Sequence, residues 1–378
     1  LPQLNASVAT NIYLDIPVSL IPGEIFGGTP GSFIPVQFGT KYNANGSVEL
    51  SQLLFDGQVF VGLQARRASL EFYERQADVT KEQIKTNVHK IYYQLVVGKK
   101  QLAALDASIT RIEKLLSDTK AYFENGFAER LDIDKVTVQL NNLKTQRLTV
   151  QNQIDMGYAG LKFLIGMPQK DQLELTDTLS EDKLKENLLV DSINYSDRKE
   201  YQLLQVAERL NKYNVRRYKL SYLPSLAAFA SYSKNAQRQD FSFLKDGSWF
   251  TTSLVGFKLN IPIFDGFAKK SNLERARISL KQTQNNMEQF RESVNMQMQQ
   301  SKLKITSALQ NVDNQKKNRE LAEQVFNTTK IKYQQGLGSN NEIYAAQLEL
   351  SLADSNYFAA LYDAIISRVE YLQAIGKL

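Results

Sequence analysis

An internal repeat constrains this fold more than any other feature, because a chain written twice folds as two copies of one supersecondary unit. Leu-Leu-Phe-Asp-Gly at 53–57 recurs as Pro-Ile-Phe-Asp-Gly at 262–266, a shift of 209 residues. From Leu63 onward the shift is 210, and it holds without a gap until Gly166 meets Gly376. Because the shift between the two copies stays constant over about a hundred residues, we predict packed helices in both copies.

The two copies differ at their beginnings. Leu-Pro-Gln-Leu at 1–4 matches Leu-Pro-Ser-Leu at 223–226, so the first copy holds 13 more residues before Phe-Asp-Gly. We expect these residues in the Gly/Pro-rich stretch 21–35, which the composition predicts to be a surface loop. A helical segment at 198–220 precedes the second copy, and we expect its counterpart upstream of Leu1.

Each copy opens with two strand-like runs, at 5–18 and 41–55 in the first copy and at 225–235 and 251–264 in the second. Alternation is clearest in the last run, where Phe257, Leu259, Ile261 and Ile263 share one face. A pair of strands is marginally stable alone. These strands are therefore predicted to pair with others.

A long helix follows each pair of strands. Apolar residues recur every seventh position from Leu63 to Ile91 and, after Gly98, again at Leu105 and Ile112. A second stripe from Val88 to Phe123 alternates with them at spacings of three and four. This is the pattern of a coiled coil. Without proline, roughly 65 residues predict a helix of about 100 Å. The second copy adds a Gln/Asn-rich middle at 282–302, which faces either bulk solvent or a water-filled interior.

Each long helix is predicted to stop at a glycine-centred turn, at Gly126 and Gly336, before a second helix returns. Ser339 and Glu342 have the spacing of a capping box, in which Ser339 accepts from a helical amide and Glu342 reaches back. The first turn carries acidic residues instead, Glu129 and Asp132.

These patterns divide the chain into five segments and predict a mixed α and β fold. The segments are a first strand pair at 1–56, a first helical hairpin at 57–166, a connector with a further helix at 167–222, a second strand pair at 223–265 and a second helical hairpin at 266–378.

The composition argues against several classes of function. There is no cysteine and one histidine, His89, which we interpret as a residue on the polar face of a helix. The net charge of +6 comes from interspersed residues, so no nucleic-acid partner is expected. No apolar run is long enough for a membrane-spanning helix. Without a glycine-rich phosphate loop or a metal cluster, we predict no enzyme activity, no catalytic residue, no metal and no cofactor.

Four amphipathic strands leave hydrogen-bonding edges unpaired unless protomers combine, and in lipid only a closed barrel satisfies every backbone group. Three copies would supply 12 strands, enough for a barrel with room inside. The long helices would then continue the barrel as a hollow cylinder.

This order of elements resembles the TolC family of outer-membrane efflux proteins, and the likeness covers essentially the whole chain. It is carried by the two Phe-Asp-Gly junctions, by Tyr-x-x-Gly-Leu-x-Ser at 333–339, by Asp-Arg-Lys-Glu at 197–200 and by Leu-Pro-Ser-Leu at 223–226. The resemblance implies a homotrimer whose 12-stranded barrel lies in the outer membrane of a Gram-negative bacterium, with its lipid around the barrel. It also implies a helical tunnel through the periplasm, with the glycine turns at its tip.

The resemblance also implies partners and site residues. A periplasmic adaptor, joined to an inner-membrane transporter, would bind the tip residues Gly126, Phe127, Ala128, Glu129, Arg130, Leu131, Gly336, Leu337, Gly338, Ser339 and Asn340.

In the family the tip is also a gate. Asp132 and Tyr333 stand where a carboxylate and a tyrosine pair. Gly338 takes the place of an arginine, for which Arg130 is the candidate substitute. Glu342 falls on one position of an acidic ring and Ala345 on the other, and a simple helix cap stays the alternative for Glu342.

The function implied is a passive duct of an efflux or secretion system, whose cargo stays open among drugs, metals and proteins. The alternative is a structural coiled-coil protein without channel activity. That alternative explains the heptads but not the two strand pairs that precede helices of matched length.

Overall fold

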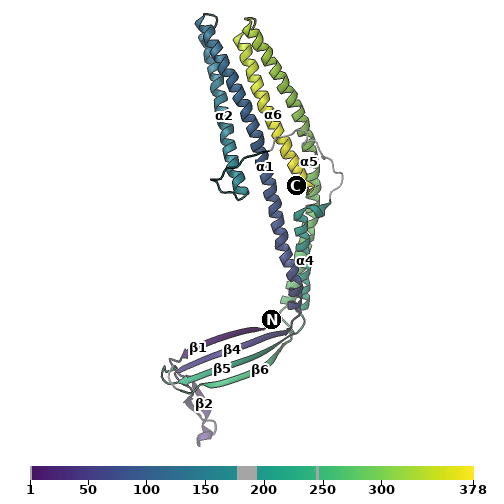
Figure 1. Ribbon diagram of the computed structural model, residues 1–378. Helices are drawn as coiled ribbons and strands as arrows, with labels where there is room; N and C mark the ends of the chain where they lie inside the picture. Colours follow the sequence, from purple (N-terminus) through teal and green to yellow (C-terminus); the bar gives the residue numbers. More distant parts are fainter. Residues whose placement is uncertain (1, 177–193, 244–246) are drawn as a thin grey trace. The chain divides into compact units, whose positions relative to one another are not determined.

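The computed structural model describes residues 2–176, 194–243 and 247–378 (Figure 1). They form two compact units, Leu1–Ser69 with Arg209–Lys281, and Leu70–Glu208 with Gln282–Leu378. The first unit holds the strands and the second holds most of the helices. The predicted mixed fold of long helices and few strands is confirmed.

The first unit contains a four-stranded antiparallel sheet in the order β1-β4-β5-β6. Its strands are β1 (Gln3–Ile12), β4 (Tyr42–Phe55), β5 (Ser225–Arg238) and β6 (Phe250–Asn260). The predicted run at 251–264 was too long, because Pro262 lacks an N–H for a ladder bond. The run at 5–18 was also too long, since β1 ends at Ile12.

The register of the sheet gives it two different faces. Leu4, Leu50, Ala230 and Val255 form one row across the four strands on an apolar face. On the opposite face, Ser7, Ser47, Ser233 and Thr252 form a row of hydroxyl groups. Because side chains alternate along every strand, the two rows cannot lie on the same face. Val255 is 76% exposed in the chain, so the apolar face has no cover there.

A small second sheet corrects the loop predicted at 21–35. β2 (Val18–Pro22) pairs antiparallel with β3 (Phe33–Gln37), and the 3-10 helix η1 (Gly23–Phe26) follows β2 directly. Apolar residues opposite one another, such as Ile21 and Ile34, favour the pairing despite the Gly/Pro-rich composition.

The helices form two hairpins (Figure 1). The first consists of α1 (Gly57–Glu124) and α2 (Arg130–Leu164), and the second of α5 (Ala268–Gln334) and α6 (Asn340–Ala374). α1 and α5 have 68 and 67 residues, and α2 and α6 have 35 each. The predicted long helices and shorter return helices are confirmed.

No helix in the described ranges is both long and apolar enough to cross a membrane.

Heptad packing buries one side of α2. The buried apolar residues of α2 recur at spacings of three, four and seven, as Ile133, Val136, Leu140, Leu143, Val150, Ile154 and Leu161. They share a buried cluster with α1, and Phe326 and Ile343 bring α5 and α6 into it. The helices of both hairpins therefore have a common core.

The start of the predicted α1 stripe is not buried in the chain, since Leu63 and Leu70 are 64% and 58% exposed. The cluster that α1 shares with α2 begins farther along α1, at Val88. A heptad stripe is buried only where a second helix lies against it. Leu63 and Leu70 are thus largely exposed in a single chain, and coiled-coil packing of this part of α1 stays a prediction.

The connector predicted at 167–222 contains residues 177–193, which lie outside the described residues. Beyond them come the 3-10 helix η2 (Tyr195–Asp197) and α4 (Lys199–Leu220). The buried Arg198 donates to the Ala374 carbonyl at 3.0 Å, at the end of α6. The helix predicted at 198–220 is thus confirmed, and its start is fixed to the end of the second hairpin.

Candidate functional site at the helix turns

The two long helices end in the same hydrogen-bonded turn. Gly126 and Gly336 have φ values of 80° and 74°, in the left-handed region that glycine adopts without strain. Phe127 N–H donates to the Tyr122 carbonyl at 2.8 Å, and Leu337 N–H donates to the Lys332 carbonyl at 2.9 Å. This is the Schellman pattern, so the predicted glycine ends of both helices are confirmed.

The turns present apolar side chains that the chain does not cover. Phe127 is 83% and Leu337 is 77% exposed, and Leu131 is also exposed. The other predicted tip side chains are exposed at Glu129, Arg130 and Ser339 and half-buried at Ala128 and Asn340. Exposed apolar side chains grouped together are typical of a surface that binds a partner. Adaptor binding by these residues stays a prediction.

The return helices are capped differently in the two turns. The Asp132 carboxylate accepts from Glu129 N–H at 3.1 Å. Ser339 Oγ accepts from Glu342 N–H at 3.3 Å, as predicted. Glu342, however, accepts from the Ser339 hydroxyl at 3.3 Å, where we expected it to reach the Ser339 backbone. The hydroxyl lies between the amide and the carboxylate, so the reciprocal box was a wrong prediction.

The predicted gate residue Tyr333 lies between the two hairpins. Its ring meets Tyr122 of α1 edge-to-face, with centroids 5.8 Å apart, and its hydroxyl hydrogen-bonds with Thr119. Burial raises the pKa of Tyr333, and the charges of Asp132 and Asp118 raise this pKa further. Asp132 is therefore within electrostatic reach of Tyr333, while a gate bond between them stays a prediction.

The candidate arginine substitute has a local partner. Arg130 Nε lies 3.4 Å from the Asp134 carboxylate on the next turn of α2, and both side chains are exposed. At Gly338, a Cβ would lie 3.3 Å from the Tyr333 backbone nitrogen, tighter than an ordinary contact. A side chain at position 338 would therefore require a small shift of its neighbours. A gate role for Arg130 stays a prediction, as does an acidic ring at the exposed Glu342.

Sequence reasoning missed the polar links between the hairpins. Lys135 Nζ donates to Asn341 Oδ1 at 2.7 Å, joining α2 to α6 just behind the turns. Farther back, Glu370 of α6 accepts from Lys90 of α1 at 3.2 Å and from Lys304 of α5 at 2.8 Å. Heptad spacing gives no signal for such polar contacts. The Lys135 and Lys90 contacts join helices from different copies, while the Lys304 contact lies within the second hairpin.

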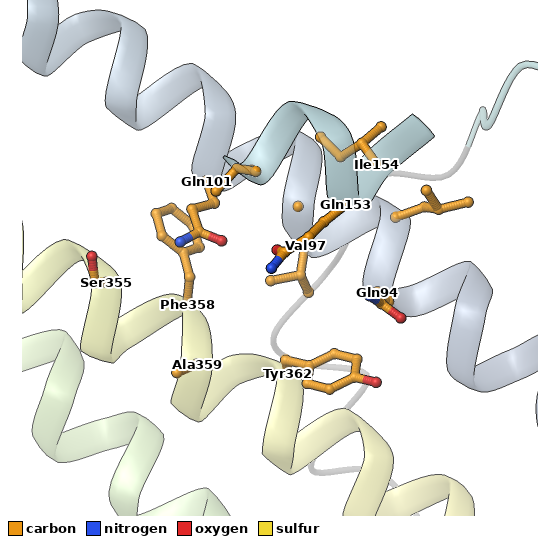
Figure 2. A pocket seen from close by; sticks show the side chains of 12 residues that line it. Gln94, Val97, Gln101, Gln153, Ile154, Ser355, Phe358, Ala359 and Tyr362 are labelled. Carbon is orange, nitrogen blue, oxygen red and sulfur yellow. The ribbon is translucent and has the colours of Figure 1, made fainter. Parts of the chain in front are cut away.

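Behind the turns, a cavity of about 330 Å³ lies among α1, α2 and α6 (Figure 2). Its polar lining consists of the amides of Gln94, Gln101 and Gln153, with Ser355 and Tyr362. None of its lining residues is an Asp, Glu, His, Lys or Arg, so the cavity offers no general acid or base that titrates near neutral pH.

His89 lies elsewhere on α1, half-buried and stacked on Tyr93. Burial lowers its pKa, and the charge of Lys85 lowers it further. In the described part of the chain, no three His, Cys, Asp or Glu side chains are grouped so that they could hold a metal ion.

Known proteins share both sequence and fold with this chain. Residues 202–377 match the family model described as outer membrane efflux protein. TolC of Vibrio cholerae is 20% identical over 337 residues, 88% of this chain and 76% of that protein. TolC of Escherichia coli is 21% identical over 354 residues, 90% of this chain and 71% of that protein.

Solved structures agree in fold. CusC superposes with a TM-score of 0.76 at 16% identity, covering 99% of this chain and 83% of CusC. The outer membrane protein VceC from Vibrio cholerae gives 0.73 at 13% identity, covering 100% of this chain and 87% of VceC. The family match over residues 202–377, the similarity to TolC along most of the chain and the shared fold all relate this protein to the TolC-like outer membrane efflux proteins.

Proposed function

We propose that this protein is the outer-membrane duct of a tripartite efflux or secretion system, passively conducting substrates delivered by an inner-membrane transporter. Its coarse function, an outer-membrane channel of an efflux system in a Gram-negative bacterium, agrees with its family and with its TolC relatives. The trimer, the partners and the site residues are the finer parts of the proposal.

The two-faced sheet is the observation that carries the proposal. Its apolar face suits lipid and its row of hydroxyl groups suits a water-filled interior. Among the described strands, β1 and β6 each have one neighbour in this sheet, so each leaves one edge free. A free edge is prohibitively costly in lipid, and pairing β1 of one copy with β6 of the next removes it. Three copies then close a 12-stranded barrel.

The helices form the tunnel of the proposed duct. The equal lengths of α2 and α6, and the nearly equal lengths of α1 and α5, support two structural repeats. Six hairpins from three copies would enclose a cylinder whose glycine turns lie at one end. There, Phe127, Leu131 and Leu337 would bind the helical hairpins of a periplasmic adaptor. A passive duct has no catalytic residue or cofactor, so the transporter would supply the energy.

The gate belongs to the same end. Asp132 and Tyr333 would pair between hairpins when the tip is closed, with Arg130 as an additional cationic partner. Glu342 of three copies would form a ring that attracts cations and repels anions. A structural coiled-coil protein without channel activity, by contrast, leaves the exposed apolar face of the sheet unexplained.

The test is the mass of the detergent-purified protein together with single-channel current in a planar bilayer. We expect a trimer with a small, cation-preferring conductance. Glu342→Gln should reduce cation preference, and Arg130→Ala should raise conductance. A monomer that is soluble without detergent and carries no current would overturn the channel, whereas unchanged currents in both variants would overturn only the gate assignments.

A further inference from the structure

A second cavity, of about 160 Å³, lies between the two hairpins close to the turns. Its lining comes from α1, α5 and the start of α6, and consists of Thr110, Arg111, Lys114, Leu115, Asp118, Phe326, Lys330, Tyr333, Gln334 and Ile343. It is therefore built by residues that lie more than 200 positions apart in sequence but face the same space.

The lining has an excess of positive charge. Arg111, Lys114 and Lys330 face one carboxylate, that of Asp118. Within the described ranges, none of these three cations forms a salt bridge. Arg111 donates to Ser108 Oγ at 2.8 Å, but its Nε is buried and has no hydrogen-bond partner there. A buried, unpaired donor on a charged group is destabilising, so an acceptor at this place would be favourable.

The walls between the charges are apolar and aromatic. The Arg111 guanidinium lies 5.8 Å from the centroid of the Phe326 ring, and Leu115 and Ile343 are buried beside the cavity. At about 30 Å³ of liquid volume per water, the cavity has room for about five waters. A ligand of that size has at most one ring. Charge, walls and volume together favour a small ring with an anionic group.

We propose that this cavity binds a small aromatic anion, a single ring bearing a phosphate or carboxylate. Arg111 of α1 and Lys330 of α5 supply the charge that holds the anionic group, and Phe326 supplies the wall for the ring. The bound anion joins α1 to α5 beside Tyr333 and removes the repulsion between their cations. The site lies within one copy of the chain, so it does not depend on the proposed channel.

The test is calorimetric titration of the full chain in detergent with phenyl phosphate. We expect saturable binding of one molecule per chain, weaker binding of inorganic phosphate, and none of neutral phenol. Arg111→Gln and Lys330→Gln should each weaken binding at least about tenfold, because each removes a charge-assisted hydrogen bond. Lys332→Gln is the matched control, because this exposed lysine is on α5 but outside the lining, and its affinity should stay within about twofold of wild type.

Three results would overturn the site. The first is no saturable binding at roughly millimolar phenyl phosphate. The second is an equal loss in Lys332→Gln, which would mean diffuse attraction by surface charge. The third is equal affinity for inorganic phosphate, which would remove the role of the ring. The two test substitutions lie on different helices, and size-exclusion profiles matching wild type confirm that each variant is folded.

Discussion

Replacing Glu370 by glutamine tests whether charge holds α1 against the second helical hairpin. Glu370 accepts from Lys90 of α1 and from Lys304 of α5, so one carboxylate on α6 joins three helices. Its side chain is 30% exposed. Burial alone would raise the pKa of Glu370, but the hydrogen bonds and charges of Lys304 and Lys90 lower that pKa overall.

The expected magnitude follows from the two pairs. A partly exposed ion pair contributes about 0.5–1 kcal/mol, so removing both costs about 1–2 kcal/mol. Amide hydrogen exchange of the α6 backbone around residue 370 should therefore accelerate about 5–30-fold at neutral pH in Glu370→Gln. Lys90→Gln and Lys304→Gln each leave one pair intact, so each should show about half the free-energy change.

The pH dependence of the stability difference between wild type and Glu370→Gln tests whether the effect is ionic. Because the folded-state pKa of Glu370 lies below the ordinary value, its stabilisation is complete above about pH 4.3 and is lost as the pH falls through the folded-state pKa. Wild type and Glu370→Gln should thus differ at neutral pH and converge in strong acid. A difference that persists in acid, or exchange within about twofold of wild type at neutral pH, would refute the ionic explanation.

Three further predictions test other parts of the molecule. Val255→Lys should cost about 2–4 kcal/mol at mid-membrane and reduce trimers in outer-membrane fractions, whereas Leu254→Lys, on the opposite face of β6, should not. Gly126→Ala should lower the melting temperature through about 1–2 kcal/mol of left-handed strain, while Gly62→Ala, with open space at its Cβ, should raise it through about 0.5–1 kcal/mol. Ser339→Ala should cost about 1 kcal/mol of capping and accelerate exchange of the Glu342 amide; unchanged exchange would contradict the cap.

Most of the fold that could be predicted from the sequence was predicted from the internal repeat. The gapless shift of 210 gave two helical hairpins with glycine ends at Gly126 and Gly336, and both are present. It could not reveal the small sheet of β2 and β3, because this sheet belongs to the extra residues of the first copy. Glycine and proline dominate that composition, while the strand pairing depends on contacts that composition does not encode.

The polar contacts between the hairpins could not be predicted from the sequence for a different reason. Lys135 binds Asn341, but the position that matches Lys135 in the second copy is Ala345. Lys90 binds Glu370, and its matching position is Gln300. A repeat shows what two copies share, whereas these two polar contacts between the copies use residues in which they differ. The sequence therefore predicted the glycine turns of the candidate site but not the polar contacts between the two hairpins.

The apolar contacts between the two hairpins limit how the proposed gate can open. Phe326 and Ile343 are buried in the cluster that α1 and α2 share, with Tyr333 packed against it. Pulling α5 and α6 away from α1 would expose both side chains at about 1.5–3 kcal/mol each, or about 3–6 kcal/mol per chain.

Such an open state would be disfavoured about a hundredfold or more in each chain, and more strongly if three chains move together. Spontaneous opening by this route would therefore be rare. Two routes avoid that barrier. Neighbouring chains can separate while each keeps its own core, or a partner bound to the exposed Phe127 and Leu337 can supply the free energy. In both, the tip opens through contacts that a single chain does not satisfy by itself.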